Sequence, residues 1–118
     1  MDRQDPRTRM RNELQAFVRL YRALEGTAIG LASVSLDGLD QSWRDRVQRI
    51  RALPREAPRR KQMIEALVKL LEHTLWKRQV EIETMLSSDG ALVAEMRTIA
   101  RRGEANATEQ TASPEPQV

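Results

Sequence analysis

The chain has 118 residues, of which 20 are Lys or Arg and 17 are Asp or Glu, and its net charge is +3. It contains no cysteine and one histidine, which excludes disulfide frameworks, thiolate metal sites and histidine-rich metal sites. No apolar run approaches the ~20 residues of a membrane-spanning helix, and the acidic start Met1–Pro6 is unlike a signal peptide. We therefore expect one small, soluble, cytoplasmic domain.

The first predicted element is a helix over residues 8–34, behind a flexible segment at 1–7. Apolar residues recur along one side of it at intervals of three and four, the helical period. This stripe consists of Met10, Leu14, Phe17, Tyr21, Leu24, Ala28 and Leu31. Gly26 and Gly30 share a face, and each costs roughly 1 kcal/mol relative to Ala in a helix interior. The glycine pair predicts either a weakened second half or a close helix crossing.

The second predicted helix follows two good N-cap residues, Asp37 and Asp40, and runs to about Leu53. Pro54 and Pro58 then stop it and bracket a short connection. Its apolar stripe consists of Leu39, Trp43, Val47 and Ile50. Because aromatic residues on such a stripe are usually core, we favour core packing for Trp43, with a partner anchor as the alternative.

The third predicted helix starts at Pro58, which suits a first helical turn, and continues to about Ser87. Its apolar positions are Met63, Ile64, Leu67, Leu70, Leu71, Leu75, Ile82, Met85 and Leu86. On one flank, Glu65, Lys69 and Glu72 are spaced as a ladder of ion pairs on the helix surface.

The fourth predicted helix is capped by Asp89, stopped by Gly103, and carries one apolar face. That face consists of Leu92, Val93, Met96 and Ile99. Residues 103–118 lack apolar periodicity and are predicted to be a disordered tail. The fold class is therefore all-α: an antiparallel bundle of three to four helices over residues 8–102, with a disordered C-terminal tail.

Catalytic chemistry is not indicated by any group of residues. The helical neighbours of His73 include neither a metal ligand nor a carboxylate that could orient it, and Glu81 and Glu83 point away from each other on a helix. The chain also lacks a glycine-rich phosphate loop, a nucleophile with a local base and a metal-ligand spacing. We expect no enzyme activity, no metal and no cofactor.

The charge is concentrated in residues 41–62, where eight basic and two acidic residues give a net +6. Such a segment can attract an acidic protein surface or nucleic acid, and it can also be a solvated helix face. The predicted basic patch consists of Arg44, Arg51, Arg59, Arg60 and Lys61.

A partner site is predicted at an apolar groove between the second and third helices, because the stripe of the third helix is broader than one packing seam. The candidate partner-binding residues are Val47, Ile50, Ile64, Leu67, Leu71 and Leu75. The fourth helix is too short to be stable alone in water, so it must dock. Its face of Leu92, Val93, Met96 and Ile99 makes it either a movable cover over that groove or permanent core.

The order of features resembles the flagellar export chaperone FliT family. The similar motifs are Leu20-Tyr21 in the first helix, Asp37-Gly38-Leu39-Asp40 at the turn before Trp43, the basic opening Arg59-Arg60-Lys61, and the ending Met85-Leu86-Ser87-Ser88. The chain departs from the family at Glu72-His73, where members usually carry an acidic pair.

The resemblance implies a small cytoplasmic chaperone whose client is the flagellar filament-cap protein. A flagellar transcription activator or the export ATPase apparatus would be further partners, and the terminal helix would mask the client site. Two rival resemblances remain open. Leu20-Tyr21-Arg22 is similar to mitochondrial LYR-motif assembly factors, although Leu53-Pro54 stands where they have Phe-Arg, and Arg59-Arg60-Lys61-Gln62 is similar to a ribosome-associated helical family. The latter implies an RNA- or ribosome-binding module that uses residues 41–62.

Overall fold

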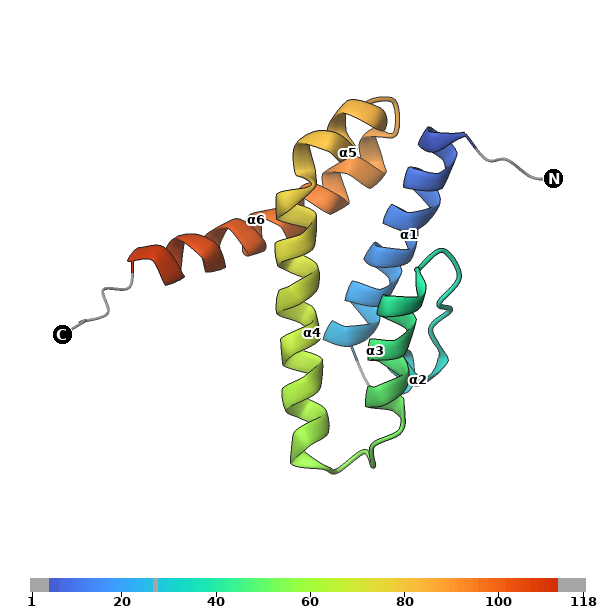
Figure 1. Ribbon diagram of the computed structural model, residues 1–118, viewed down its shortest axis with the longest axis vertical. Coiled ribbons are helices and arrows are strands. Elements are labelled where there is room, and N and C mark those ends of the chain that lie inside the picture. The colour runs from blue at the N-terminus through green and yellow to red at the C-terminus, as the bar shows by residue number, and fades with distance from the viewer. Residues whose placement is uncertain (1–4, 27, 113–118) are drawn as a thin grey trace.

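The computed structural model describes residues 5–26 and 28–112, and within them the regular secondary structure is all helical. The side chains of residues 28–29 and 108–112 are not described. In chain order the helices are α1 (Pro6–Glu25), α2 (Ala28–Ser33), α3 (Gln41–Arg51), α4 (Pro58–Lys77), α5 (Gln79–Met85) and α6 (Gly90–Ala112). The all-α prediction is confirmed. Figure 1 shows α1 and α3 running in the same direction, with α4 antiparallel to both.

The predicted helix over residues 8–34 is divided in two. Asp5 caps its start, because Oδ1 accepts a hydrogen bond of 2.8 Å from the Thr8 N–H. The helix then ends at Gly26, whose ψ of −138° is far from the helical region. The chain turns there so that α2 packs against the end of α1, with Gly30 beside Ala23.

The connection from α2 to α3 packs closely against α1. Gly38 has φ +95°, and a Cβ there would lie 3.0 Å from the Asn12 carbonyl oxygen and 3.1 Å from the Ala16 Cβ. Both the left-handed conformation and the close approach require glycine. Asp40 then caps α3, as predicted, by accepting a hydrogen bond of 3.2 Å from the Trp43 N–H.

The predicted third helix starts at Pro58 as expected but is interrupted at Arg78, which has φ −100° and ψ 7°. The interruption lets α5 lean toward α1 and α6, so that Ile82 and Leu86 enter the core. The Arg78 guanidinium lies 3.1 Å from the Glu13 carboxylate of α1. This ion pair holds the bend between α4 and α5 against α1.

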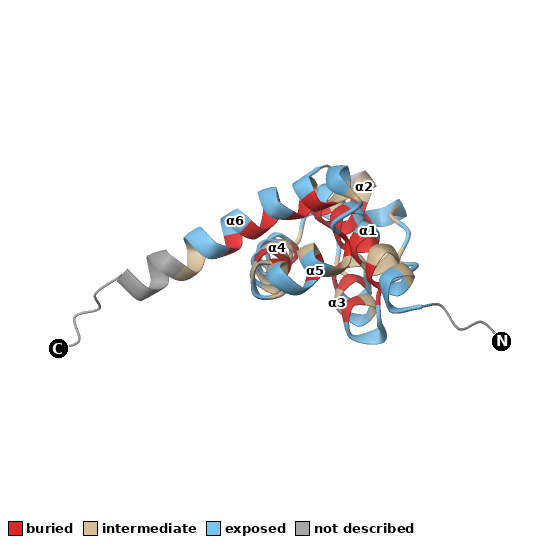
Figure 2. Ribbon diagram, turned by 90° about the horizontal axis from the view of Figure 1, so that it is seen from above, coloured by how far each residue is buried: buried red, intermediate tan, exposed pale blue. Residues whose placement is uncertain are grey.

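The predicted stop at Gly103 is wrong, because α6 continues through it to Ala112. A Cβ at Gly103 would lie 2.1 Å from the Glu72 carbonyl oxygen, so glycine serves here to let α6 touch the backbone of α4. Beyond this crossing α6 extends away from α1 (Figures 1 and 2). The predicted tail is therefore helical over 103–112, and its remainder, 113–118, lies outside the described residues.

The core lies where the inner faces of α1, α3, α4 and α6 meet (Figure 2). Phe17 and Trp43 pack edge to face in it, with ring centroids 5.1 Å apart, and Trp43 is buried as expected. Trp76 is half-buried at the margin of the core. The most extensive helix pairing is that of α4 with α6.

Candidate functional site

Most of the predicted partner-binding residues lie in the core instead of an open groove. Val47, Leu71 and Leu75 are completely buried, and Ile64 is half-buried against the core. Ile50 and Leu67 are also buried but line a surface depression. The structure therefore corrects the prediction: the stripes of α3 and α4 are used mainly for folding, and only their outer edge is available to a partner.

That outer edge is a groove between α3 and α4 with a volume of about 190 Å³. Its surface is mostly apolar, and two arginines of α3 lie along one side of it. The lining residues are Arg46, Arg49, Ile50, Met63, Ala66, Leu67 and Leu70. We call this depression the α3–α4 groove.

The predicted basic patch is not one continuous surface. Arg44 Nε donates to the Leu39 carbonyl oxygen at 2.9 Å. The Arg51 guanidinium donates to two carbonyl oxygens at the end of α2, that of Leu31 in its last turn and that of Val34 just after it, the latter at 2.7 Å. Carbonyls at irregular backbone need donors, and these two arginines supply them.

The other three members of the predicted patch lie in the first turn of α4. Arg59 and Lys61 are exposed there, whereas Arg60 retains only 7% of its surface. The patch is thus divided between structural arginines, an exposed pair and one buried arginine.

The predicted cover helix is docked, but away from the α3–α4 groove. Val93, Met96 and Ile99 are buried and Leu92 is half-buried, in packing against α4, α1 and α5. None of the α6 side chains that the structure describes, those of residues 90–107, lines the α3–α4 groove. The prediction that this helix covers the partner groove is therefore wrong for the arrangement in the structure.

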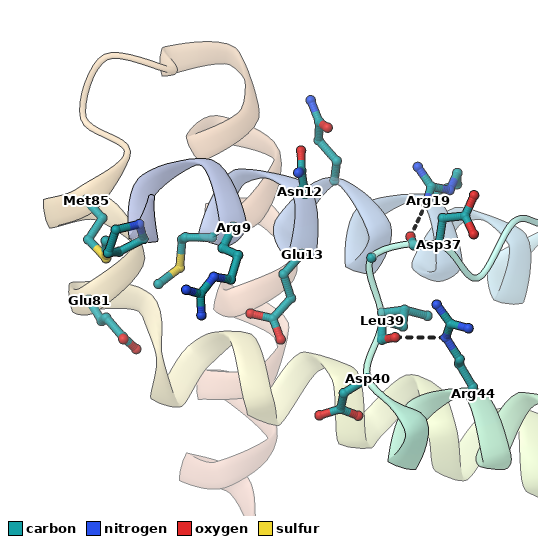
Figure 3. Close-up of a pocket in the computed structure, with 14 residues that line it drawn as sticks. Arg9, Asn12, Glu13, Arg19, Asp37, Leu39, Asp40, Arg44, Glu81 and Met85 are labelled. Carbon is teal, nitrogen blue, oxygen red and sulfur yellow. Dashed lines mark hydrogen bonds between the residues drawn. The ribbon is translucent and has the colours of Figure 1, made fainter. Parts of the chain in front are cut away.

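A larger cleft of about 790 Å³ lies between α1, the 34–40 connection and α5 (Figure 3). Its charged lining comprises three arginines and four acidic residues, so the cleft does not select one sign of charge. Several of them are already engaged. Arg19 donates to the Asp37 carbonyl oxygen at 2.8 Å, and Glu13 pairs with Arg78. This cleft is a less specific candidate than the groove.

A buried polar network joins α1, α4 and α6, and sequence reasoning missed it. The Tyr21 hydroxyl donates to Glu72 Oε2 at 2.6 Å, and Arg102 Nη1 donates to the Tyr21 oxygen at 2.6 Å. Arg102 also reaches Glu25 at 2.9 Å, and Asn106 Nδ2 donates to Glu72 Oε1 at 2.9 Å. The predicted surface ladder is therefore wrong at Glu72, which is only 6% exposed.

Burial raises the pKa of Tyr21 above its usual value, and the hydrogen bond to Glu72 raises it further. Because each carboxylate oxygen of Glu72 has a donor, the network holds three helices together and offers no free reactive group. One signal for it was available: Tyr21 lies on the apolar stripe of α1, and a buried tyrosine hydroxyl usually needs a polar partner.

His73 is exposed, with its ring 5.7 Å from that of Trp76. Within the described residues, no group of three His, Cys, Asp or Glu side chains could hold a metal ion. None of the helices described combines the length and apolar character that a bilayer crossing requires.

Comparison of the chain with protein-family models, with curated proteins and with solved structures finds no match. The α3–α4 groove is thus the feature with the clearest recognition chemistry.

Proposed function

We propose that the protein is a small cytoplasmic chaperone or adaptor that binds an acidic, amphipathic segment of another protein in the α3–α4 groove. The observation that carries this proposal is an apolar depression with two arginines, Arg46 and Arg49, along one side. An amphipathic helix binds such a groove through apolar anchors spaced three or four residues apart. Acidic residues beside those anchors would then face the arginines of α3.

The size of the groove favours a protein ligand. Its volume of about 190 Å³ is below the roughly 300–1,000 Å³ of sites that enclose a small molecule. One or two apolar side chains from a partner suit this volume better. The half-buried Met63 and Leu70 would contact them, and Met adapts its shape readily to different partners.

The charge at the groove favours an acidic partner. Arg46 is held along α3 by hydrogen bonds to Ser42 and lies over the Trp43 ring, 5.5 Å from its centroid. Arg49 is exposed. Both arginines belong to the segment of net charge +6, so acidic segments would associate faster and neutral ones more slowly.

The resemblance to the FliT family supplies the most specific form of the proposal, in which the client is the flagellar filament-cap protein. The same groove could serve an assembly factor of the LYR type with another client. RNA binding through residues 41–62 is the alternative from a different class, and the exposed Arg59 and Lys61 favour it.

A peptide-display selection on the immobilised full chain tests the proposal. We expect enriched peptides to combine apolar anchors with Asp or Glu. The blocking variant is Ala66→Glu, because Ala66 is exposed and lines the groove. Its matched control is Ala94→Glu, which makes the same charge change at an exposed site on α6. Binding should fall at least about tenfold in Ala66→Glu and remain in Ala94→Glu, since a like charge opposes an acidic ligand.

Two results would contradict the proposal. One is a set of selected peptides that bind Ala66→Glu as tightly as the unchanged protein. The other is tight binding of a single-stranded RNA oligonucleotide that weakens steeply between low and moderate salt, as phosphate contacts require. That second result would replace the adaptor function by the nucleic-acid alternative.

A further inference from the structure

Arg60 is a mostly buried arginine that forms no ion pair with the described residues. It is only 7% exposed, and its Nε is buried without a hydrogen bond. The other guanidinium nitrogen in this condition, Arg11 Nε, lies 3.9 Å from the Asp89 carboxylate. Arg60 forms no such ion pair within the ranges that the structure describes. A buried donor without an acceptor is destabilising, so its retention needs a reason.

Arg60 lies in the first turn of α4, where the helix is uncapped. The N-cap residue is Ala57, which has no side-chain acceptor for the first N–H groups. The Arg60 N–H donates to the Ala57 carbonyl oxygen at 3.0 Å, and Pro58 has no N–H. The Arg59 N–H therefore remains without a hydrogen-bond acceptor in the described part of the chain.

The arginine and the helix terminus attract the same kind of ligand. The N-terminus of a helix carries partial positive charge, and its free N–H groups bind oxyanions. Because Cα–Cβ bonds in a helix tilt toward its N-terminus, the Arg60 side chain leans over this first turn. A carboxylate placed there would accept hydrogen bonds from the guanidinium and from the Arg59 N–H.

This turn precedes the residues of α4 that line the α3–α4 groove. Arg60, Met63 and Leu67 lie three and seven residues apart on α4 and so share one face. Met63 and Leu67 line the groove. A segment that seats an apolar side chain in the groove can thus extend a neighbouring acidic residue toward Arg60.

We infer that the first turn of α4, with Arg60, is a binding site for a carboxylate supplied by the segment that occupies the α3–α4 groove. The inference rests on the proposed function and adds to it the chemistry of the partner: an Asp or Glu about one helical turn from its apolar anchor.

The thermal stability of the full chain gives the first test, which needs no partner. Arg60→Met should raise Tm by about 4 °C or more in chloride buffer, because an apolar side chain of similar length removes the unpaired charge. Replacing chloride by acetate, a carboxylate probe, or by inorganic phosphate at constant ionic strength should raise the Tm of the unchanged protein by about 2 °C near half-saturation. Arg60→Met should lack that response.

Arg59→Met is the matched control, since it makes the same charge change at the adjacent exposed residue. It should keep most of the acetate response and gain no stability. A drop in Tm for Arg60→Met, or an equal anion response in all three proteins, overturns the inference. If Arg60→Met does not fold, Arg60→Gln carries the same comparison.

The second test uses a groove-binding peptide obtained by the display selection. Changing its acidic residue to the corresponding amide should weaken binding to the unchanged protein about tenfold, the typical worth of a charge-assisted hydrogen bond. The same change should have little effect on binding to Arg60→Met. Equal losses in both proteins would overturn the inference.

The two proposals can fail separately. Groove peptides that require Ala66 but show no carboxylate preference leave the adaptor function standing and overturn the site at Arg60. An acetate response that requires Arg60, in a chain for which no peptide depends on the groove, supports the anion site and removes its protein partner. A rise in Tm with phosphate but not with acetate contradicts the proposal that the ligand is a carboxylate and favours a phosphorylated ligand.

Discussion

The two ends of α4 differ in how their largely buried charged residues, Arg60 and Glu72, are bonded. Toward the middle and end of the helix, Glu72 is buried and receives hydrogen bonds from Tyr21 and Asn106, with Arg102 close by. At the start of the helix, Arg60 is buried to a similar extent but lacks an ionic partner among the described residues. Both side chains are largely removed from water, and only Glu72 has its buried polar atoms satisfied within the fold.

This difference distinguishes the surface of α4 that packs within the fold from the surface that is available to a ligand. A fully satisfied polar network rigidifies the structure, whereas an unsatisfied buried group marks a site where stability has been given up. On the side of α4 that faces α6, the buried carboxylate of Glu72 has its hydrogen-bond donors within the fold. The α3 side carries a groove and an unpaired guanidinium, so recognition is expected there.

Gly103→Ala should have the largest effect on stability, and it tests the contact between α4 and α6. In most helix interiors this change stabilises by about 1 kcal/mol. Here the new Cβ would lie 2.1 Å from the Glu72 carbonyl oxygen, so the two helices must separate. We expect a loss of about 3 kcal/mol or more in the free energy of unfolding, measured by chemical denaturation.

Gly90→Ala is the control for this change, because a Cβ at Gly90 meets nothing within 4 Å. Its free energy of unfolding should change by about 0.5 kcal/mol or less, or rise slightly. Equal effects of the two substitutions would show that the α4–α6 crossing is looser than the structure has it.

Tyr21→Phe should have the next largest effect, because it removes the hydroxyl that links Glu72 to Arg102. The buried carboxylate would lose one donor, and the expected loss is about 2 kcal/mol in the free energy of unfolding. A double-mutant cycle with Arg102→Met measures how strongly the two side chains act together. Simple additivity of the two losses would argue against a cooperative network.

Raising the pH should weaken the same network by a smaller amount. The pKa of Tyr21 is raised in the folded protein, so above about pH 10 the unfolded chain loses the phenol proton before the folded chain does. Stability therefore falls as pH rises beyond that value, by at most about 1.4 kcal/mol per pH unit for this group. Denaturation of Tyr21→Phe in parallel isolates the contribution, which should be absent in the variant.

Ala66→Glu should have the smallest effect on stability, because the side chain is exposed at the edge of the groove. We expect a change below about 0.5 kcal/mol in the free energy of unfolding, as for most surface substitutions. The value matters for the comparison: a large loss would mean that the α3 side of α4 is as tightly built as the α6 side.

The fold was predictable from the sequence where local signals and packing agree. The apolar stripe of α1, the Asp40 cap and the Pro58 start all lie where the pattern places them. The break at Arg78 had no such signal, since Arg is a good helix former. It depends on contacts with Glu13 and Met10, which are distant in the sequence.

Glycine misled the prediction of α6 because its two uses look alike in a sequence. The low helix propensity of glycine predicts a stop at Gly103, yet this residue lies inside α6 and allows a close contact with α4. The basic patch failed for a related reason, since a sequence does not show that Arg51 is bonded to backbone carbonyls or that Arg60 is buried. In the candidate site, the residues Ile50 and Leu67 were foreseen, whereas the basic side of the groove at Arg46 and Arg49 was not.

The pairing of α1 with α6 has a consequence for the chain as it is synthesised. Arg102 bonds to Tyr21 across 81 residues, and Arg22 of α1 pairs with Glu95 of α6. At about 5–20 residues per second, translation of such a stretch takes several seconds. During that interval α1 has been made but α6 has not. Until α6 has been made, the apolar face of α1 is covered by α3 through contacts such as that of Phe17 with Trp43.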